Sequence, residues 1–181
     1  MIRASVIGWP ISHSRSPLIH NQWIKQHGID AHYDAQAVAP ERLSDFISSL
    51  REGERVGCNV TIPHKESAIS AVDEPDERVL RVGALNTIWR ENGRLHATSS
   101  DGQGFMANVA QTLPQFAVAD TQVTILGAGG STRALVDELL RSGVQRVNIH
   151  NRTHSRAEDV AHHFGAKVQA ITSIDLAATL K

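Results

Sequence analysis

Short apolar runs of strand length recur along the first half of the chain. They occupy residues 2–8, 31–38 and 56–62. Runs of this length, bounded by turn-forming residues, predict β-strands. Two more strands are expected within residues 83–100, because Asn92-Gly93 between two apolar runs is a strong signal for a hairpin turn.

Helical periodicity separates these runs. Residues 41–51 are predicted to form an amphipathic helix, since their apolar side chains repeat at i, i+3, i+4 and i+7. A helix from Ser16, as N-cap ahead of Pro17, is expected to end before Gly28. Residues 63–82 have a helical pattern broken at Pro75, and residues 103–113 return to it.

Beyond residue 121 the pattern becomes a regular alternation of strand and helix. Strands are predicted at 122–127, 145–152 and 166–171, and helices at 131–142 and 155–164. This order is typical of a doubly wound parallel sheet. Periodicity lapses between residues 113 and 121, so we expect an α/β chain of two domains. The first, residues 1–115, has a mixed sheet, and the second, residues 116–181, is a partial Rossmann-type domain.

Composition narrows the class of protein. The 181 residues are 41% hydrophobic and 20% charged, as in globular proteins, and the formal net charge is −1. We therefore expect no nucleic-acid partner and no attraction to anionic membranes. No apolar run reaches 18 residues, so no membrane span is predicted. A single cysteine, Cys58, fits a reducing compartment, and the expected location is cytoplasmic.

A glycine-rich turn joins the first strand and helix of the second domain. Gly127, Gly129 and Gly130 follow the strand directly. Glycines at this junction let the backbone approach a pyrophosphate, which then binds the N–H groups at the helix start. Thr132 stands where the third glycine of the usual spacing would be. A purely structural turn explains such a run about as well as a dinucleotide site does.

The next strand favours NADP over NAD. NAD sites usually end this strand with an acidic residue that binds the ribose hydroxyl. Here the strand is followed by Asn151, Arg152, Thr153 and Arg156, with no acid among them. Arginine pairs bidentately with phosphate, which predicts recognition of a 2′-phosphate. A basic helix start exposed to solvent is the alternative.

"CNVTIPHKE", residues 58–66, places a lysine directly after a predicted strand. Lys65 is either a solvated surface charge or a group that transfers a proton. Ser16 and Asn86 have similar structural explanations, as a helix cap and a turn residue, because such side chains often bond to local backbone. His162-His163 and the other histidines lack a converging ligand set, so no metal is expected.

Several separated motifs together resemble one family. They are "VIGWPISHSRSPLIHN", "NVTIPHKE", "VGALNT", "DGQGF", "GAGGSTRA" and "NRT", in family order between residues 6 and 156. The chain resembles shikimate dehydrogenase, which reduces 3-dehydroshikimate with NADPH in the route to chorismate and the aromatic amino acids. The resemblance implies a small-molecule substrate, shikimate, and NADP as the cofactor.

The resemblance also assigns residues. The implied substrate-binding residues are Ser14, Ser16, Thr61, Lys65, Asn86 and Asp101. Lys65 is the expected acid and base of the reaction, and Asp101 is its partner, which positions the amine and the substrate hydroxyl. The implied cofactor-binding residues are Glu77, Gly127, Ala128, Gly129, Gly130, Ser131, Asn151, Arg152, Thr153 and Arg156.

The chain departs from the family pattern in two places. It reads "SSD" at residues 99–101, where the family usually has "NTD". It also stops at Lys181, so that roughly a third of the family's length, including the second half of the cofactor domain, is missing. The apolar edge thereby exposed calls for a partner or a second copy of the chain, a homo-oligomer. Two alternatives stay open: a quinate/shikimate enzyme with looser cofactor choice, and a non-catalytic fragment that binds NADP or shikimate.

Overall fold

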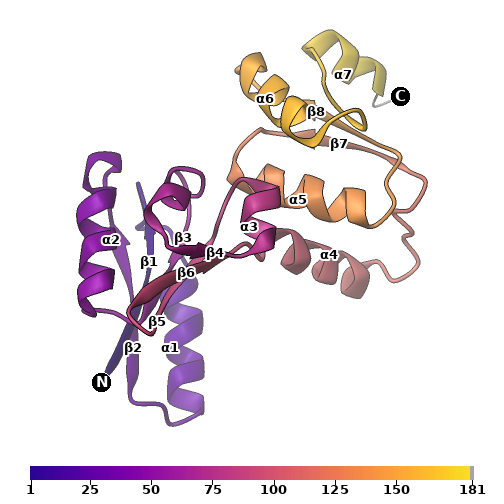
Figure 1. Cartoon of the computed structure of the whole chain (residues 1–181). Helices are drawn as coiled ribbons and strands as arrows, with labels where there is room; N and C mark the ends of the chain where they lie inside the picture. Colours follow the sequence, from indigo (N-terminus) through magenta and orange to yellow (C-terminus); the bar gives the residue numbers. More distant parts are fainter. Residues whose placement is uncertain (180–181) are drawn as a thin grey trace. The chain divides into compact units, whose positions relative to one another are not determined.

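The computed structural model describes residues 1–179, which fall into two compact units. The first unit is Met1–Ser99, and the second begins at Ser100 (Figure 1). The sequence placed the junction near residue 115. By its contacts, helix α4 (Asp101–Thr112) belongs to the second unit, because it packs against α5 (Gly130–Arg141).

The first unit combines a mixed six-stranded sheet with short helices. Its strands are β1 (Ile2–Gly8), β2 (Ala31–Ala37), β3 (Gly57–Val60), β4 (Glu74–Pro75), β5 (Thr87–Glu91) and β6 (Arg94–Thr98). Its helices are α1 (Ser16–Gln26), η1 (Pro40–Arg42), α2 (Leu43–Glu52), η2 (Ser67–Ala71) and α3 (Glu77–Val82). The strand order is β2-β1-β3-β5-β6-β4, in which β5 runs antiparallel to both β3 and β6. The predicted mixed sheet is confirmed.

The two faces of this sheet carry cores of different size. Ile7 belongs to the larger cluster, together with the apolar face of α2, and its neighbour Val6 belongs to a smaller one with Ile11 and Tyr33. Successive strand residues point to opposite faces, so the two clusters lie on opposite sides of the sheet. Burial of each large apolar side chain in them stabilises the fold by about 1.5–3 kcal/mol.

Turn chemistry explains where several elements end. Asn92 and Gly93 both have positive φ, of 51° and 79°, so the predicted hairpin between β5 and β6 is confirmed. Ser16 is not the N-cap of α1, because the cap is Arg15 and Ser16 is the first helical residue. The two-residue strand β4 was not predicted, since it is too short to show a period.

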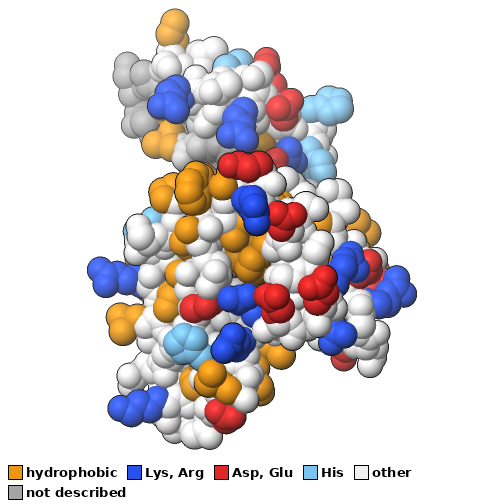
Figure 2. All heavy atoms as spheres, turned by 90° about the vertical axis from the view of Figure 1, so that its left-hand side faces the viewer, with side chains coloured by type: hydrophobic (Ala, Val, Ile, Leu, Met, Phe, Trp, Pro, Cys, Tyr) orange, Lys and Arg blue, Asp and Glu red, His pale blue; other side chains and the backbone are white. Residues whose placement is uncertain are grey.

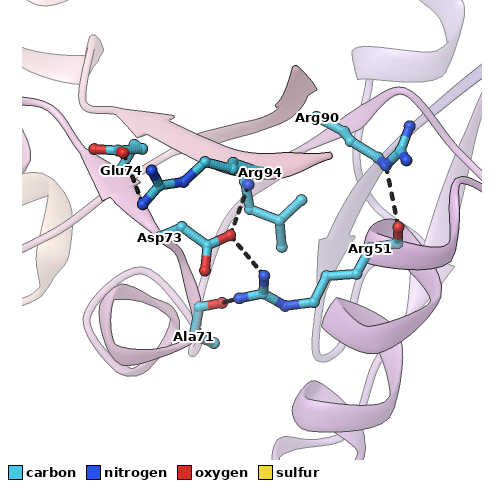
Figure 3. A network of polar contacts seen from close by, with 7 residues as sticks. Arg51, Ala71, Asp73, Glu74, Arg90 and Arg94 are labelled. Carbon is cyan, nitrogen blue, oxygen red and sulfur yellow. Dashed lines mark hydrogen bonds and ion pairs between the residues drawn. The ribbon is translucent and has the colours of Figure 1, made fainter. Parts of the chain in front are cut away.

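A network of polar contacts joins the end of α2 to residues of β4, β5 and β6 and to the segment before β4 (Figure 3). The Arg51 guanidinium donates to the Asp73 carboxylate over 2.6 Å and to the Ala71 carbonyl over 2.9 Å. The same carboxylate oxygen accepts the backbone N–H of Leu95 in β6 over 2.8 Å. Arg94 pairs with Glu74 at 2.8 Å, and Arg90 donates to the Arg51 carbonyl. These contacts join the end of α2, the segment at residues 71–73 and the three strands β4, β5 and β6.

The second unit is a parallel sheet with helices. Its elements are α4, β7 (Gln122–Leu126), α5, β8 (Arg146–His150), α6 (His154–Phe164), β9 (Val168–Ala170) and α7 (Ser173–Thr179). Both strand pairs in the order β7-β8-β9 are parallel. Its core joins β8 and the helices through Val136, Val147, Ile149 and Val160. The predicted α/β class and the Rossmann-like pattern of this part are confirmed. Helix α7 was not predicted.

The surface is mixed in charge. On the face drawn in Figure 2, Lys and Arg side chains lie among Asp and Glu side chains. This agrees with the formal net charge of −1. Within residues 1–179, none of the helices has both the length and the apolar character needed to cross a bilayer.

Candidate functional site

Five of the predicted substrate residues lie at one edge of the first sheet. Ser14 and Ser16 follow the carboxyl end of β1, and Thr61 and Lys65 follow the carboxyl end of β3. Asn86 directly precedes β5, which runs antiparallel to β3, so it also lies at this edge. Ligands of α/β proteins commonly bind at the carboxyl ends of parallel strands. The sheet therefore gathers these five residues in one region.

Backbone hydrogen bonds tie the loops of this edge together. The N–H of Trp9 donates to the Ile62 carbonyl over 3.0 Å, which links the loops after β1 and β3. The N–H of Val60 donates to the Asn86 carbonyl, and the N–H of Leu85 donates to the Lys65 carbonyl, both over 2.8 Å. The backbones of Lys65 and Asn86 are thus held by neighbouring segments of the first unit.

Gly8 lets the loops after β1 and β3 approach closely. A methyl group on its Cα would lie 2.7 Å from Thr61 Cγ2 and 2.9 Å from the Ile62 carbonyl oxygen. Both distances are far inside van der Waals contact. Any side chain at position 8 would push Thr61 away from β1.

His64 anchors the segment that carries Lys65. It is 1% exposed, and its Nε2 lies 2.7 Å from the Val38 carbonyl oxygen. A carbonyl only accepts hydrogen bonds, so Nε2 must carry the proton. The neighbouring Lys65 is half-buried. Burial of the histidine thus fixes the segment directly before the lysine.

The two serines lie at the start of α1. Both are half-buried, and the backbone N–H of Ser16 lies 3.3 Å from Ser14 Oγ. No side-chain hydrogen bond caps this helix. The structural explanation of Ser16 as a capping residue is therefore wrong, because the helix begins without one.

A line of side-chain hydrogen bonds, not foreseen from the sequence, leads to Asn86. The Tyr33 hydroxyl donates to Asn59 Oδ1 over 2.6 Å, and Asn59 Nδ2 donates to Thr87 Oγ1 over 3.1 Å. Thr87 Oγ1 in turn donates to Asn86 Oδ1 over 3.1 Å. Burial raises the pKa of Tyr33, so its hydroxyl keeps the proton that it donates. Strand register brings these side chains together, and a period-2 pattern does not reveal register between strands.

The glycine-rich turn of the second unit has the conformation that its residues predict. Gly127 has a φ of +119°, which favours glycine, and its N–H donates to the His150 carbonyl over 2.8 Å. The Thr132 hydroxyl donates to the Gly127 carbonyl over 3.0 Å. Thr132, in the place of the third glycine, therefore closes the turn by a hydrogen bond. A side chain at Gly129 would meet nothing within 4 Å, so the space in front of the turn is open.

Asp101 lies beside this turn. It is the first residue of α4, and its carboxylate accepts a hydrogen bond from the Ser131 hydroxyl over 3.2 Å. Gly102 permits the close approach of α4, because a methyl group there would overlap the Ala134 carbonyl oxygen of α5. Asp101 and Lys65 consequently belong to different units.

A cavity of about 440 Å³ opens at the ends of β8 and β9. Its lining comprises His150, Asn151, Arg152, His154, Thr172 and Ser173. Two of the predicted 2′-phosphate residues, Asn151 and Arg152, thus line it, and Thr153 and Arg156 do not. The sequence did not predict the other four lining residues, His150, His154, Thr172 and Ser173. Thr172 and Ser173 follow β9 rather than β8, so their place beside Arg152 depends on the pairing of the two strands.

Glu77 stands apart from the other predicted cofactor residues. It is exposed in the first turn of α3, in the first unit. A carboxylate at this position suits the positive end of the helix dipole, which explains Glu77 without a ligand. Among residues 1–179, no three His, Cys, Asp or Glu side chains are grouped so as to hold a metal ion.

Known proteins place the chain in a family. Residues 6–88 match the model of the shikimate dehydrogenase substrate binding domain, and residues 108–181 match that of shikimate / quinate 5-dehydrogenase. A shikimate dehydrogenase (NADP(+)) of Brucella canis is 51% identical over 93% of the chain and 58% of its own length. The chain thus spans about three fifths of this curated relative.

Solved structures agree. The shikimate dehydrogenase of Aquifex aeolicus has a TM-score of 0.90 at 30% identity, over 99% of this chain and 66% of that one. The enzyme of Thermus thermophilus, in complex with NADP(H) and shikimate, has a TM-score of 0.82 at 31% identity, over 95% and 63%. Sequence motifs, sheet order and these likenesses agree, and the chain belongs to the shikimate dehydrogenase family.

Proposed function

We propose that the chain binds shikimate and NADP and interconverts shikimate and 3-dehydroshikimate. The observation that carries this proposal is the gathering of Ser14, Ser16, Thr61, Lys65 and Asn86 at one edge of the first sheet. Membership of the family supports it, as do related structures solved with shikimate and with NADP.

The substrate residues suit a small polyhydroxylated acid. In the proposal, the hydroxyls of Ser14 and Ser16 bind the substrate carboxylate, and Thr61, Lys65, Asn86 and Asp101 bind the ring hydroxyls. Hydroxyl, amide and ammonium groups match such a ligand, since each buried oxygen needs a hydrogen-bond partner. The short spacing between Ser14 and Ser16, held by the contact between them, favours binding to one carboxylate.

Lys65 is the proposed acid and base. When shikimate is oxidised, the carbinol carbon loses a hydride, its hydroxyl loses a proton, and a carbonyl forms. A bound NADP would supply the hydride acceptor, and in the proposal the amine of Lys65 accepts the proton. In the reverse direction the Lys65 ammonium returns the proton to the developing alkoxide. Asp101 is the proposed partner, which orients the amine and the hydroxyl.

The second unit fits the cofactor. The glycine turn, with Ala128 and Ser131, presents N–H groups at the start of α5, and these suit a pyrophosphate. Arg152 in the wall of the 440 Å³ cavity suits a 2′-phosphate. Asn151, Thr153 and Arg156, which are close to Arg152 in the sequence, are the other residues proposed for this phosphate. Asn151 Nδ2 donates to the Thr153 carbonyl over 2.7 Å, so in the proposal it shapes the loop. Glu77 remains the weakest of the proposed cofactor residues because it is exposed in the first unit.

One observation favours a second candidate. The family model that matches residues 108–181 is described as shikimate / quinate 5-dehydrogenase, and a structure of a Listeria monocytogenes relative, 28% identical, holds shikimate and NAD. An enzyme that accepts quinate, or NAD, is therefore the alternative.

Calorimetric titration of the 181-residue chain with four ligands distinguishes these functions. We expect shikimate to bind more tightly than quinate, and NADP to bind more tightly than NAD. Ser14→Ala should weaken shikimate binding and leave NADP binding unchanged, whereas Ser48→Ala, on α2, should change neither. Equal affinities for shikimate and quinate, and for NADP and NAD, would establish the alternative. Absence of shikimate binding would refute the proposal.

A further inference from the structure

The ring of Tyr33 lies against a histidine of α1. His20 and Tyr33 stack, with their ring centroids 4.2 Å apart and their planes 14° from parallel. Trp23, three residues further along the helix, meets the His20 ring at 5.4 Å and an angle of 81°. His20 is not among the residues proposed above for the substrate or the cofactor, yet its ring contacts the tyrosine whose hydroxyl leads toward Asn86.

Asn21, the next residue of α1, holds the backbone of Tyr33. The strand β2 is at the edge of the first sheet, and an edge strand has backbone groups that no other strand pairs with. The Asn21 side-chain amide donates to the Tyr33 carbonyl over 2.7 Å, and its oxygen accepts the Tyr33 N–H over 3.0 Å. Two consecutive residues of α1 thus hold the backbone and the ring of one tyrosine.

The His20 ring serves as a flat, uncharged surface for this contact. It is half-buried, and burial lowers the pKa of its imidazole, so the neutral form is favoured. Tyr33 itself is 5% exposed and packs in one cluster with Val6 and Ile11. The stack with His20 therefore completes the enclosure of the Tyr33 ring on the side of α1.

The direction of the Tyr33 ring determines where its hydroxyl points. This hydroxyl is the first donor in the hydrogen bonds that lead through Asn59 and Thr87 to Asn86. The contact with Asn59 Oδ1 is 2.6 Å long, and a hydrogen bond weakens steeply when its angle departs from the favoured range. Because the hydroxyl is at the far end of the ring, a tilt of the ring displaces it more than any other ring atom.

We propose that His20 is a positioning residue for the substrate site, which acts by holding the Tyr33 ring in the orientation from which its hydroxyl reaches Asn59. The inference rests on the proposed binding of shikimate. The helix α1 then serves this site twice, since Ser16 lies one turn before His20 on the same side of the helix. Ser16 touches the substrate, whereas His20 acts on it only through other side chains.

Two substitutions test the stack. His20→Leu removes the aromatic ring, and His20→Phe keeps one. His27→Leu is the matched control, because it makes the same change at the exposed residue that follows α1. Calorimetry measures the binding of shikimate and of NADP to each 181-residue chain, and circular dichroism checks that each variant is folded.

His20→Leu should weaken shikimate binding about two- to tenfold, as expected for the loss of a stacked aromatic pair, and should leave NADP binding unchanged. His20→Phe and His27→Leu should bind shikimate like the wild type. In a Tyr33→Phe background, which lacks the hydroxyl, His20→Leu should cause little further loss, because changes within one series of contacts are not additive. A merely structural role of His20 predicts the same loss in both backgrounds.

The chain has a single tyrosine, which gives a second readout. With isotope-labelled tyrosine, the ring signals in a nuclear magnetic resonance spectrum belong to Tyr33 alone. Shikimate should shift the signal of the Cζ atom, which bears the hydroxyl, because the hydrogen bonds from this hydroxyl end at a proposed substrate contact. The shift should be smaller in His20→Leu, and NADP should cause none.

Failure of the inference and failure of the proposed function are distinguishable. If the wild-type chain binds no shikimate, the proposed function falls, and the inference falls with it. The role of His20 alone is refuted if the wild type binds shikimate and any one of three results is found. These are unchanged binding by His20→Leu, a loss in His20→Phe as large as that in His20→Leu, and a wild-type Tyr33 signal that shikimate does not shift. Equal losses in the two backgrounds would refute it as well.

Discussion

A series of hydrogen bonds that begins on β2 and β3 and ends at Thr87 orients the side-chain amide of Asn86. Tyr33 has a hydroxyl proton to donate, which makes Asn59 Oδ1 the acceptor and Asn59 Nδ2 the donor to Thr87. Thr87 then donates to Asn86 Oδ1, so the nitrogen of this amide is the atom able to donate to a hydroxylated ligand. At the residue scale, a buried tyrosine thus determines the polarity of a proposed substrate contact.

Tyr33→Phe tests this arrangement. The change leaves the buried Asn59 oxygen without its donor, which should lower the free energy of unfolding by about 1–3 kcal/mol. It should also weaken shikimate binding roughly three- to tenfold, because the series of hydrogen bonds that orients the Asn86 amide then lacks its first donor. Urea denaturation and calorimetry measure the two effects. A chain that loses stability but binds shikimate as before would show that Tyr33 is structural only.

Asp73 gives the stability of the first unit a defined dependence on pH. The hydrogen bond from Arg51, followed by that from the Leu95 N–H, holds the pKa of the Asp73 carboxyl below its ordinary value. The folded-state pKa is thus lower than the unfolded one. The stabilisation is therefore complete above about pH 4 and is lost as the pH falls through the folded-state pKa.

Asp73→Asn should remove this contribution, so the variant should be less stable than the wild type at pH 6 and the difference should shrink below pH 4. Asp45→Asn is the matched control, because Asp45 makes only an exposed ion pair with Arg42. Thermal unfolding followed across pH 2.5–6 is the measurement. An equal stability difference at all pH values would contradict the assignment.

At the element scale, two glycines of α4 have opposite environments. A methyl group at Gly102 would overlap the Ala134 carbonyl of α5, whereas one at Gly104 would meet nothing within 4 Å. Gly102→Ala should therefore destabilise the second unit by about 1–3 kcal/mol, because α4 must move away from α5. Gly104→Ala should stabilise it by about 0.5–1 kcal/mol through the lower entropy of the unfolded chain.

Denaturation of both variants measures these effects, and the Gly102 change should also displace Asp101 from Ser131. Loss of stability in Gly104→Ala, or none in Gly102→Ala, would contradict the close packing of α4 on α5.

Much of this architecture was predictable at the level of elements. Amphipathic periods revealed α2, and Asn92-Gly93 revealed the β5–β6 hairpin, because both signals are local. The place of α4 was not predictable. Its contact with α5 depends on Gly102, which in sequence is one glycine among several. The hydrogen bonds from Tyr33 to Asn86 and the place of His154 in the cavity were also not predicted. Both depend on which strands lie side by side, and a pattern along one strand does not reveal this.

At the scale of the whole molecule, the proposed chemistry draws on both units. Lys65 and the serines belong to the first unit, and Asp101 and the glycine turn belong to the second. Each unit has its own apolar core. Ligand binding by either unit can therefore be tested separately from the proposed turnover.

The most direct measurement of the central claim is the rate of NADPH formation, followed by absorbance, when the 181-residue chain is mixed with shikimate and NADP. We expect a shikimate-dependent rate that falls at least about a hundredfold in Lys65→Ala, because a positioned acid–base group contributes that much. NADP affinity should stay unchanged in this variant. Lys25→Ala, at an exposed lysine of α1, should keep the full rate. No shikimate-dependent NADPH formation by the wild-type chain, or an undiminished rate in Lys65→Ala, would contradict the account.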